Sequence, residues 1–358
     1  AVKNQKAAPT TALFVADPVV TVPTTPLSAF EMNYHTQYYK QYPVSFGDGS
    51  YAMVFNFKDT DHSDVNYQKW NAWMQRFNAS HHRIGAATVL NPFNGENVYL
   101  TGTEYNTLSL GDDNAVNLYQ YNDPKPTGRS LTTLFFQIIN KNGKVGPEIM
   151  VDGCELYTPT NCDYPANYDG YVDSGKLMTF PNNEFIVLYR TNADRETYQN
   201  VITGTSAYKA IFYQRNQYFI KRFNKDGQSL TTKRVIVQND LYQSNSFFSV
   251  YGAIPSNTVF SDGSYMVCYY GFYFDDSYSY DAALSTEDQR ATRCQRMNQT
   301  DGYAGPAIDV KNDRDPSQYL YPRKLMVFSD DSWAIVGTMN AAVRPTYTTS
   351  QKTRLFLV

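Results

Sequence analysis

The sequence predicts an all-β fold, specifically a five-bladed β-propeller of four-stranded antiparallel blades. The first observation is composition, because the 358 residues include 31 Tyr, 21 Phe, 20 Gly and 17 Pro. Aromatic side chains suit a pleated surface, and Gly, Pro, Asn and Asp favour the turns between strands. The second observation is a hairpin pattern that recurs five times. The third is an N-terminal segment that matches one strand of this repeat.

The first hairpin of each repeat has an aromatic residue or Leu, then turn residues, then a strand. Each turn carries an Asp-Gly, Asp-Asp or Asn-Asn pair, and these residues tolerate the positive φ that a tight turn requires. The five segments are Phe46–Tyr51, Leu110–Ala115, Phe180–Phe185, Phe260–Tyr265 and Phe328–Trp333. Strands are expected to follow directly, at Tyr51–Phe55, Phe185–Tyr189, Tyr265–Tyr269 and Trp333–Val336.

A second hairpin follows in each of the first four repeats. Its entering strands end at Gln75–Asn78, Gln137–Asn140, Lys221–Asn224 and Gln295–Asn298. Its exit strands are expected at Ile84–Val89, Val145–Val151, Thr232–Val237 and Ala304–Val310. Two hairpins make one four-stranded antiparallel unit, and such units in tandem are typical of propeller blades.

The fifth repeat ends at its third strand, Thr353–Val358, and the N-terminal part of the chain offers the missing strand. A seven-residue segment aligns residue by residue with 304–310; it consists of Ala16, Asp17, Pro18, Val19, Val20, Thr21 and Val22. We therefore expect an arm, residues 1–29, whose strand 16–22 completes the last blade of a propeller formed by residues 30–358. Completion removes two exposed sheet edges. The strand closes either its own ring or that of a neighbouring copy, and head-to-tail donation produces an open filament.

The repeat resembles the propeller-type tandem repeats of secreted and surface-anchored bacterial proteins. Its pattern is Gln-Arg-aromatic-Asn followed by glycines and a Val-ending strand, and then an Asp-Gly type hairpin. Gln137–Val151 and Phe180–Tyr189 match best, and the resemblance covers most of residues 40–358. It implies blade architecture, and the proteins that carry it are similar to adhesins, surface-layer components or binding scaffolds.

The four cysteines form two pairs that are close in sequence. Cys154 and Cys162 lie in one polar loop, and Cys268 and Cys294 lie on strands expected to be neighbours in one blade. Even numbers of cysteines in local pairs predict two disulfides and an oxidising compartment. The alternative is a zinc site, which the absence of a Cys-x-x-Cys motif and of a nearby His opposes.

Two Asn-x-Ser/Thr sequons, at Asn78 and Asn298, fall at the same point of the repeat, in the second hairpins of the first and fourth units. They are candidate glycosylation sites. The adjacent His81 and His82 lie at a predicted turn, and neighbouring residues of a strand face opposite sides, so we interpret them as solvated turn residues rather than a metal site.

Two groups of carboxylates are candidates for catalysis or for metal binding. Five-bladed glycoside hydrolases resemble this chain at Ala16-Asp17-Pro18, the context of their general base, but the partner acid that glycoside hydrolysis needs has no matching segment. Asp17 also occupies a repeat position held by Gly305 elsewhere, so the sequence predicts no catalytic residue. The acidic loop with Asp59, Asp61 and Asp64 is a candidate Ca²⁺ site without the usual loop spacing. Solvated loop carboxylates are the alternative, and no other cofactor is predicted.

Tyrosine is in excess. Exposed rim tyrosines such as Tyr278 and Tyr280 are candidates for stacking on sugars or for a protein interface. For most of the 31 tyrosines we expect packing between blades with the hydroxyl at the rim.

The net charge is −3 with 18% charged residues and no long basic run, which predicts neither nucleic-acid binding nor a membrane partner. No apolar run is long enough for a membrane span. A first residue other than Met suggests a processed, secreted or cell-surface chain.

We carry three hypotheses for function. The first is a non-catalytic extracellular structural or surface protein that self-assembles into filaments or a surface layer through its arm. The second is a carbohydrate- or protein-binding propeller of the lectin or adhesin kind. The third is a five-bladed-propeller glycoside hydrolase.

Overall fold

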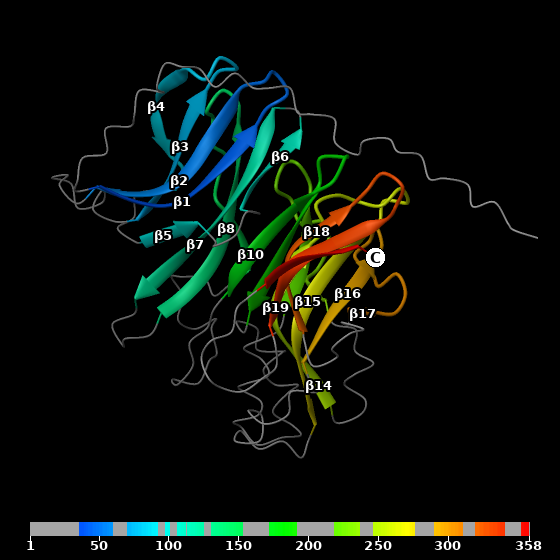
Figure 1. The fold of residues 1–358 in the computed structure, drawn as a ribbon. Coiled ribbons are helices and arrows are strands. Elements are labelled where there is room, and N and C mark those ends of the chain that lie inside the picture. Colours follow the sequence, from blue (N-terminus) through cyan, green and yellow to red (C-terminus); the bar gives the residue numbers. More distant parts are fainter. Residues whose placement is uncertain are drawn as a thin grey trace, which may run out of the picture. The chain divides into compact units, whose positions relative to one another are not determined.

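The computed structural model describes residues 36–59, 70–91, 97–100, 106–111, 113–124, 130–152, 172–191, 218–236, 246–275, 290–310, 319–340 and 352–357. Within these ranges the regular elements are all strands, arranged in five antiparallel sheets that follow one another along the chain (Figure 1). The predicted all-β class and its repeated four-stranded antiparallel units are therefore confirmed. We call the sheets blades 1 to 5 in chain order.

Strand bounds follow the repeat closely. Blade 1 contains β1 (Thr36–Ser45), β2 (Tyr51–Asp59), β3 (Asn71–Phe77) and β4 (Arg83–Val89). Blade 2 contains β5 (Asn97–Leu100), β6 (Thr107–Gly111), β7 (Asn114–Pro124), β8 (Ser130–Asn140) and β9 (Ile149–Asp152). Blade 3 contains β10 (Val172–Thr179), β11 (Phe185–Thr191), β12 (Tyr218–Phe223) and β13 (Arg234–Val235).

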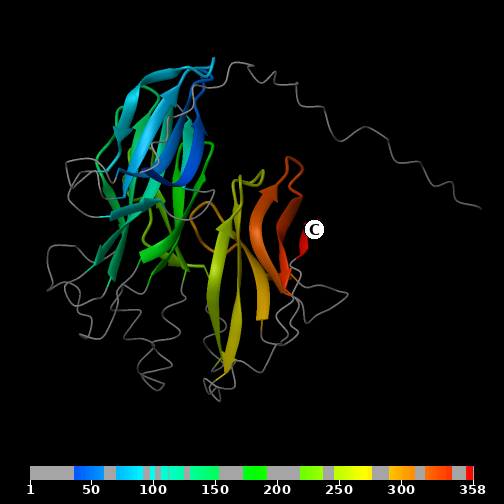
Figure 2. The same cartoon turned by 60° about the vertical axis from the view of Figure 1, so that its left-hand side comes forward.

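Blade 4 contains β14 (Ser246–Pro255), β15 (Tyr265–Asp275), β16 (Arg290–Met297) and β17 (Ile308–Val310). Blade 5 contains β18 (Tyr319–Val327), β19 (Trp333–Asn340) and β20 (Lys352–Leu357). Figure 2 shows the yellow strands of blade 4 and the orange strands of blade 5 as separate sheets.

The first hairpins have the turn geometry that their Asp-Gly, Asp-Asp and Asn-Asn pairs predict. One residue at the same position of every turn has a positive φ, between 60° and 80°: Gly49, Asp113, Asn183, Gly263 and Asp331. Gly, Asn and Asp are the residues that adopt this conformation at low cost. Each repeat thus has its first tight turn at the same position, and this turn sets the register of the two strands that it joins.

The first strand of every blade is irregular at a similar level, a feature that the repeat pattern did not predict. In blade 2 it is divided into β5 and β6, which both pair with β7. In the other blades the register shifts once along the strand, between Tyr39 and Gln41, Asp173 and Lys176, Val250 and Gly252, and Pro322 and Lys324. Bulges of this kind bend a strand and increase its twist.

Consecutive blades pack face to face, and each of the four cores described is shared by two neighbours. On β11 the alternate side chains serve different cores: Val187 and Tyr189 join the core with blade 2, while Ile186 and Leu188 join the core with blade 4. Because both faces are covered, this strand reads as a continuous apolar run rather than an alternating one. Tandem four-stranded sheets stacked in this way have the arrangement of propeller blades.

Candidate functional site

The Gln and Asn residues of the Gln-Arg-aromatic-Asn motif, at the ends of the third strands, hold the second hairpin of a blade together. In blade 4, Gln295 Nε2 donates a hydrogen bond to the carbonyl of Gly305 at 2.9 Å and so holds the exit segment. Asn298 Oδ1 accepts from the N–H groups of Thr300 and Gly302, at 2.9 and 2.8 Å, and caps the turn. The Gln bond recurs between Gln75 and Gly85 and between Gln137 and Gly146.

In blades 1 and 3 the arginine of the motif joins its blade to the next, whereas Arg296 in blade 4 bonds Ser264 and Asp262 of its own blade. Arg76 Nη1 in blade 1 donates to the carbonyl of Lys141, in the second-hairpin turn of blade 2, at 2.8 Å. Arg222 in blade 3 reaches the corresponding turn of blade 4, where it binds Asp301. We call the space that each of these side chains fills, between a third strand and the second-hairpin turn of the next blade, an arginine slot.

The slot between blades 3 and 4 holds a buried polar network. Arg222 Nη2 lies 2.6 Å from Asp301 Oδ1, and its Nη1 lies 3.1 Å from Glu184 Oε2. Tyr265 donates its hydroxyl to Asp301 Oδ1 at 2.8 Å, and the guanidinium stacks 4.0 Å from the centre of the Phe180 ring. Burial opposes the charged form of Arg222, but Asp301, Tyr265 and Glu184 together outweigh this effect and raise the pKa of Arg222. Burial, followed by the charge of Asp301, raises the pKa of Tyr265 well above its ordinary value.

The slot between blades 2 and 3 is different because Ile138 stands where its neighbours carry arginine. Ile138 pairs with Val116, just as Arg76 pairs with Ala52 and Arg222 pairs with Ile186. The phenylalanine that receives an arginine in blade 3 is also replaced in blade 2, by Leu110.

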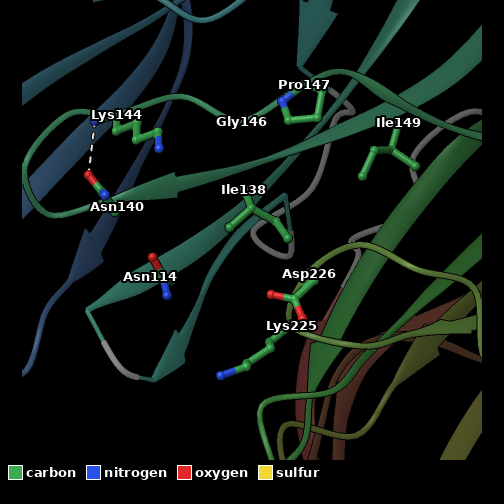
Figure 3. A pocket seen from close by; sticks show the side chains of 9 residues that line it. All are labelled: Asn114, Ile138, Asn140, Lys144, Gly146, Pro147, Ile149, Lys225 and Asp226. Carbon is green, nitrogen blue, oxygen red and sulfur yellow. Dashed lines mark hydrogen bonds between the residues drawn. The ribbon is translucent and has the colours of Figure 1, made fainter.

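A hollow of about 250 Å³ lies at this place (Figure 3). Blade 2 supplies most of its wall, and the second-hairpin turn of blade 3 supplies Lys225 and Asp226. The complete lining is Asn114, Ile138, Asn140, Lys144, Gly146, Pro147, Ile149, Lys225 and Asp226. Its floor is apolar, and its rim carries amides, two ammonium groups and one carboxylate.

Lys176 is a second unusual group. Its side chain is buried between blades 3 and 4, and Nζ donates to the carbonyl of Ala253 on β14. Burial, with the added repulsion of Arg323 on β18, lowers the pKa of Lys176 from 10.5 to about 8. Among the described residues no carboxylate is paired with it. A cation in this position works against folding at neutral pH.

Blade 5 differs from the others at its outer edge. Its described part has three strands, β18, β19 and β20. Within the described residues β20 pairs only with β19, whereas the third strands of the other blades, β3, β8, β12 and β16, each pair with two strands. The segment predicted to pair at this edge, Ala16 to Val22, lies outside the described residues, as does the whole arm. Its role stays a prediction.

One of the two predicted disulfides is confirmed. Cys268 on β15 and Cys294 on β16 are directly opposite each other and are bonded. Both are fully buried in the core between blades 4 and 5. Cys154 and Cys162 lie outside the described residues, so their pairing stays a prediction.

The two sequons occupy equivalent turns. Asn298 is exposed and Asn78 is half-buried, and both use the carboxamide oxygen to cap the turn. In the same turns of blades 2 and 3, Asn140 and Asn224 make the same capping bonds but lack a Ser or Thr two residues later. His81 is an exposed turn residue with φ of 64°, and His82 is exposed beside it, as predicted.

The remaining candidates fall largely on undescribed segments. Asp59 is the last residue of β2. Asp17, Asp61, Asp64, Tyr278 and Tyr280 lie outside the described residues. Within the described ranges no group of three or more His, Cys, Asp or Glu side chains could hold a metal ion. In the same ranges no helix is long and apolar enough to cross a membrane.

The expectation that tyrosines pack between blades is met by the tyrosines of blade 2. Tyr119 and Tyr121 are buried in the core with blade 1. Both hydroxyls donate to Glu148 Oε1 at 2.5 Å. Burial, with the nearby Glu148 charge, raises the pKa of Tyr119 well above its ordinary value.

Sequence reasoning missed the arginine slots and Lys176. The slots had a signal: Arg recurs in three of the four second hairpins that carry the motif position, and Ile138 is the exception. Lys176 had none, because its burial depends on a bulge in β10 and on the neighbouring blade.

No family model matches the sequence, and no curated protein matches it either. Solved structures with a similar arrangement include a levansucrase from Bacillus subtilis, with 10% identity and a TM-score of 0.40 over 90% of this chain and 85% of that one. An α-L-arabinanase from Penicillium chrysogenum complexed with arabinobiose has 12% identity and a TM-score of 0.43, over 85% of this chain and 78% of that one. An endo-arabinase from Bacteroides thetaiotaomicron has 8% identity and a TM-score of 0.34, over 89% and 93%. Identities and scores this low carry no argument about activity.

Proposed function

We propose that the chain is an exported, non-catalytic structural protein that assembles with copies of itself by adding a strand to the outer edge of β20. The observation that carries the proposal is the three-stranded described part of blade 5, beside four blades whose third strand has partners on both sides. An open edge presents a row of N–H and C=O groups that an extended segment satisfies. A donated strand therefore links one copy to the next.

The repeat predicts a register for this pairing. In blade 4 the exit strand pairs Val310 with Thr292 and Ile308 with Cys294. Because Arg296 and Leu357 hold equivalent places opposite Met266 and Ala334, Cys294 corresponds to Leu355. With 16–22 aligned on 304–310, we therefore expect Val20 opposite Leu355.

The polar residues of the repeat support a structural role. The motif Gln residues hold the exit segments, and two of the motif arginines join consecutive blades, so these side chains stabilise the architecture. The buried disulfide supports an oxidising, extracellular setting.

Cysteine cross-linking tests the proposal. Single variants Val20→Cys and Leu355→Cys are mixed and oxidised, and the junction is identified by mass spectrometry of unreduced peptides. We expect a disulfide between different copies that increases with concentration. The matched control is Val19→Cys, whose side chain is offset by one residue and faces the other side of the strand, and it should cross-link far less.

The double variant in one chain separates the two routes. Two results together would show that the arm closes its own ring and would rule out assembly by this edge: the double variant forms its disulfide only within single chains, and the mixture of single variants stays monomeric in light scattering. No bond by either route would rule out the strand pairing itself.

A further inference from the structure

At each of the four interfaces between consecutive blades, one face of a blade packs against the opposite face of the next blade. We call these the forward face of the earlier blade and the back face of the later one. One residue pair recurs at every interface: the residue before the first turn, on the forward face, and the first residue of the second strand, on the back face. The pairs are Phe46 with Ala115, Leu110 with Phe185, Phe180 with Tyr265, and Phe260 with Trp333.

The forward face of blade 5 and the back face of blade 1 belong to none of the cores formed by the described residues. Phe328, which comes before the first turn of blade 5, is 41% exposed, whereas its four counterparts are 2% to 8% exposed. Tyr51 of blade 1 is half-buried, whereas three of its four counterparts, Ala115, Phe185 and Tyr265, are fully buried. Within a single chain, therefore, blade 1 does not cover Phe328 as a following blade covers each counterpart.

The back face of blade 1 is apolar. Tyr51 stacks on Phe77 with 5.0 Å between the ring centres, and Met53 lies two residues further along the same face of β2. All three side chains are half-buried. The residues that hold the place of Phe77 in blades 2, 3 and 4 are at most 1% exposed, each in the core with the preceding blade: Ile139, Phe223 and Met297. Blade 1 thus presents the kind of surface that receives a preceding blade elsewhere in the chain.

The two uncovered faces are complementary in chemistry. At the interface between blades 3 and 4, Phe180 and Tyr265 meet edge to face with 5.5 Å between their ring centres. Phe328 and Tyr51 are the same two residue types at the same two positions. Edge-to-face aromatic pairs of this kind contribute to packing beyond the area that they bury.

The charged groups of the arginine slot have no counterpart on these two faces. Asp301 and Arg222 form the ion pair between blades 3 and 4. The place of Asp301 in blade 1 is held by His81, and the φ angles of these two turn residues are 62° and 64°. The place of the motif arginine in blade 5 is held by Leu357. Contact between the faces therefore leaves no buried carboxylate or guanidinium without its partner at this point.

The order of the chain indicates which copy supplies the back face. In blade 4 the exit strand β17 ends at Val310, and the chain then forms β18 from Tyr319, the first strand of the blade that covers blade 4. In the proposed function, strand 16–22 of one copy takes the place of an exit strand at blade 5 of another copy. The same chain then forms β1 from Thr36. The copy that donates the strand therefore also brings its blade 1 to the forward face of the blade that it completes.

We propose that the back face of blade 1 is a docking surface for the forward face of blade 5 of a second copy, with Tyr51 of one copy packed against Phe328 of the other. The choice of a second copy rests on the proposed function and on the exposure of Phe328 within the single chain. The contact joins two different faces, so it is head-to-tail and extends as an open array. The blades of one copy continue into those of the next, with the same kind of interface at the junction.

Variants blocked on one face test the docking. Phe328→Lys puts a charge on the forward face of blade 5, and Tyr51→Lys puts one on the back face of blade 1, so each variant keeps one intact face. In analytical ultracentrifugation we expect each variant alone to associate at least tenfold more weakly than the wild type, and an equimolar mixture to form dimers but few larger species. The matched control is Leu230→Lys, at an apolar residue of blade 3 that is 47% exposed, and it should associate like the wild type.

Thermal unfolding of dilute protein distinguishes docking between copies from closure within one chain. Because Phe328 is exposed in the single chain, Phe328→Lys should leave the melting temperature unchanged. A lowered melting temperature, together with a mixture that stays monomeric, would show that blade 5 packs on blade 1 of its own chain and would overturn the proposal. If Tyr51→Lys does not fold, Met53→Lys blocks the same face in its place.

The cross-link between Val20→Cys and Leu355→Cys separates this contact from the strand pairing. Phe328→Lys is added to the Leu355→Cys variant, so that the accepting blade carries the block. If the disulfide between copies forms equally fast with and without the block, and the blocked variants associate like the wild type, the strand pairing stands and the docking of the faces is wrong. If the blocked mixture forms dimers without this disulfide, the docking stands and the strand donation is wrong. A wild type that stays monomeric at high concentration would overturn both.

Discussion

Replacement of Lys176 by Met gives a quantitative test of how the blades pack. The ammonium of Lys176 is buried between blades 3 and 4 with one described partner, the carbonyl of Ala253, and faces the positive charge of Arg323. Met has a similar length and no charge, so the substitution removes the titrating group while keeping most of the packing.

The magnitude follows from the pKa. The folded chain holds the pKa of Lys176 at about 8, against 10.5 in the ordinary case. Each pH unit between these values changes the free energy of unfolding by about 1.4 kcal/mol, so the full effect is about 3 kcal/mol. Between pH 8 and 10.5 the unfolded chain binds more protons, so the stability of the wild type rises with pH. Below pH 8 the whole destabilisation is present.

The assay is urea unfolding of wild type and Lys176→Met at several values from pH 7 to 10.5. We expect the free energy of unfolding of the wild type, relative to that of the variant, to rise by about 3 kcal/mol across this range. Loss of the hydrogen bond to Ala253 shifts all values of the variant equally, and the ionisation of Tyr119 and Tyr265 is common to both proteins. The control is Lys324→Met, an exposed lysine of β18, which should show no such trend. A wild-type minus variant difference that stays flat with pH would refute the reasoning.

The remaining predictions concern the arginine network, the disulfide and the glycans. Arg222→Leu leaves the buried carboxylate of Asp301 without its cation and should lower the free energy of unfolding by about 3–5 kcal/mol, and pairing it with Asp301→Asn should restore much of the loss in a double-mutant cycle. Replacing both Cys268 and Cys294 by Ala should lower the free energy of unfolding by about 3 kcal/mol, as expected for a loop of this length, and reductant should then shift the melting temperature less than it does in the wild type. After expression through a glycosylating secretory pathway, peptide mass spectrometry should find glycan on the motif Asn of blades 1 and 4 and none on the equivalent Asn of blades 2 and 3, and glycan at all four or at none would contradict this.

The repeat made most of the fold predictable. The turn residues at Asp48-Gly49 and at Asn182-Asn183 predicted the hairpins because their conformational preference is local. The pairing of Cys268 with Cys294 was also predictable, since the hairpin register places them opposite each other. These features depend on neighbours within one blade.

What the sequence did not reveal depends on contacts between blades. The bulge before Lys176 and the division of blade 2's first strand leave no local signal, because they are set by the fit of one sheet against the next. Prediction of the hollow at Ile138 requires knowing that Arg76 and Arg222 each span an interface between blades. A recurring arginine within the motif was visible, but its partner in the following repeat was not.

The alternate side chains of β11 belong to two different cores, and this has a consequence for how the protein is divided. A single blade cut from the chain would expose every apolar face that it packs against a neighbour, two faces in the case of blades 2, 3 and 4, so no blade should fold alone. The smallest autonomous fragment contains at least two consecutive blades, and its stability grows with each added neighbour as in a one-dimensional array. Truncation should therefore reduce the cooperativity of unfolding in steps of one whole blade. A gene that gains or loses one repeat must keep a packed interface on both sides of the point of change.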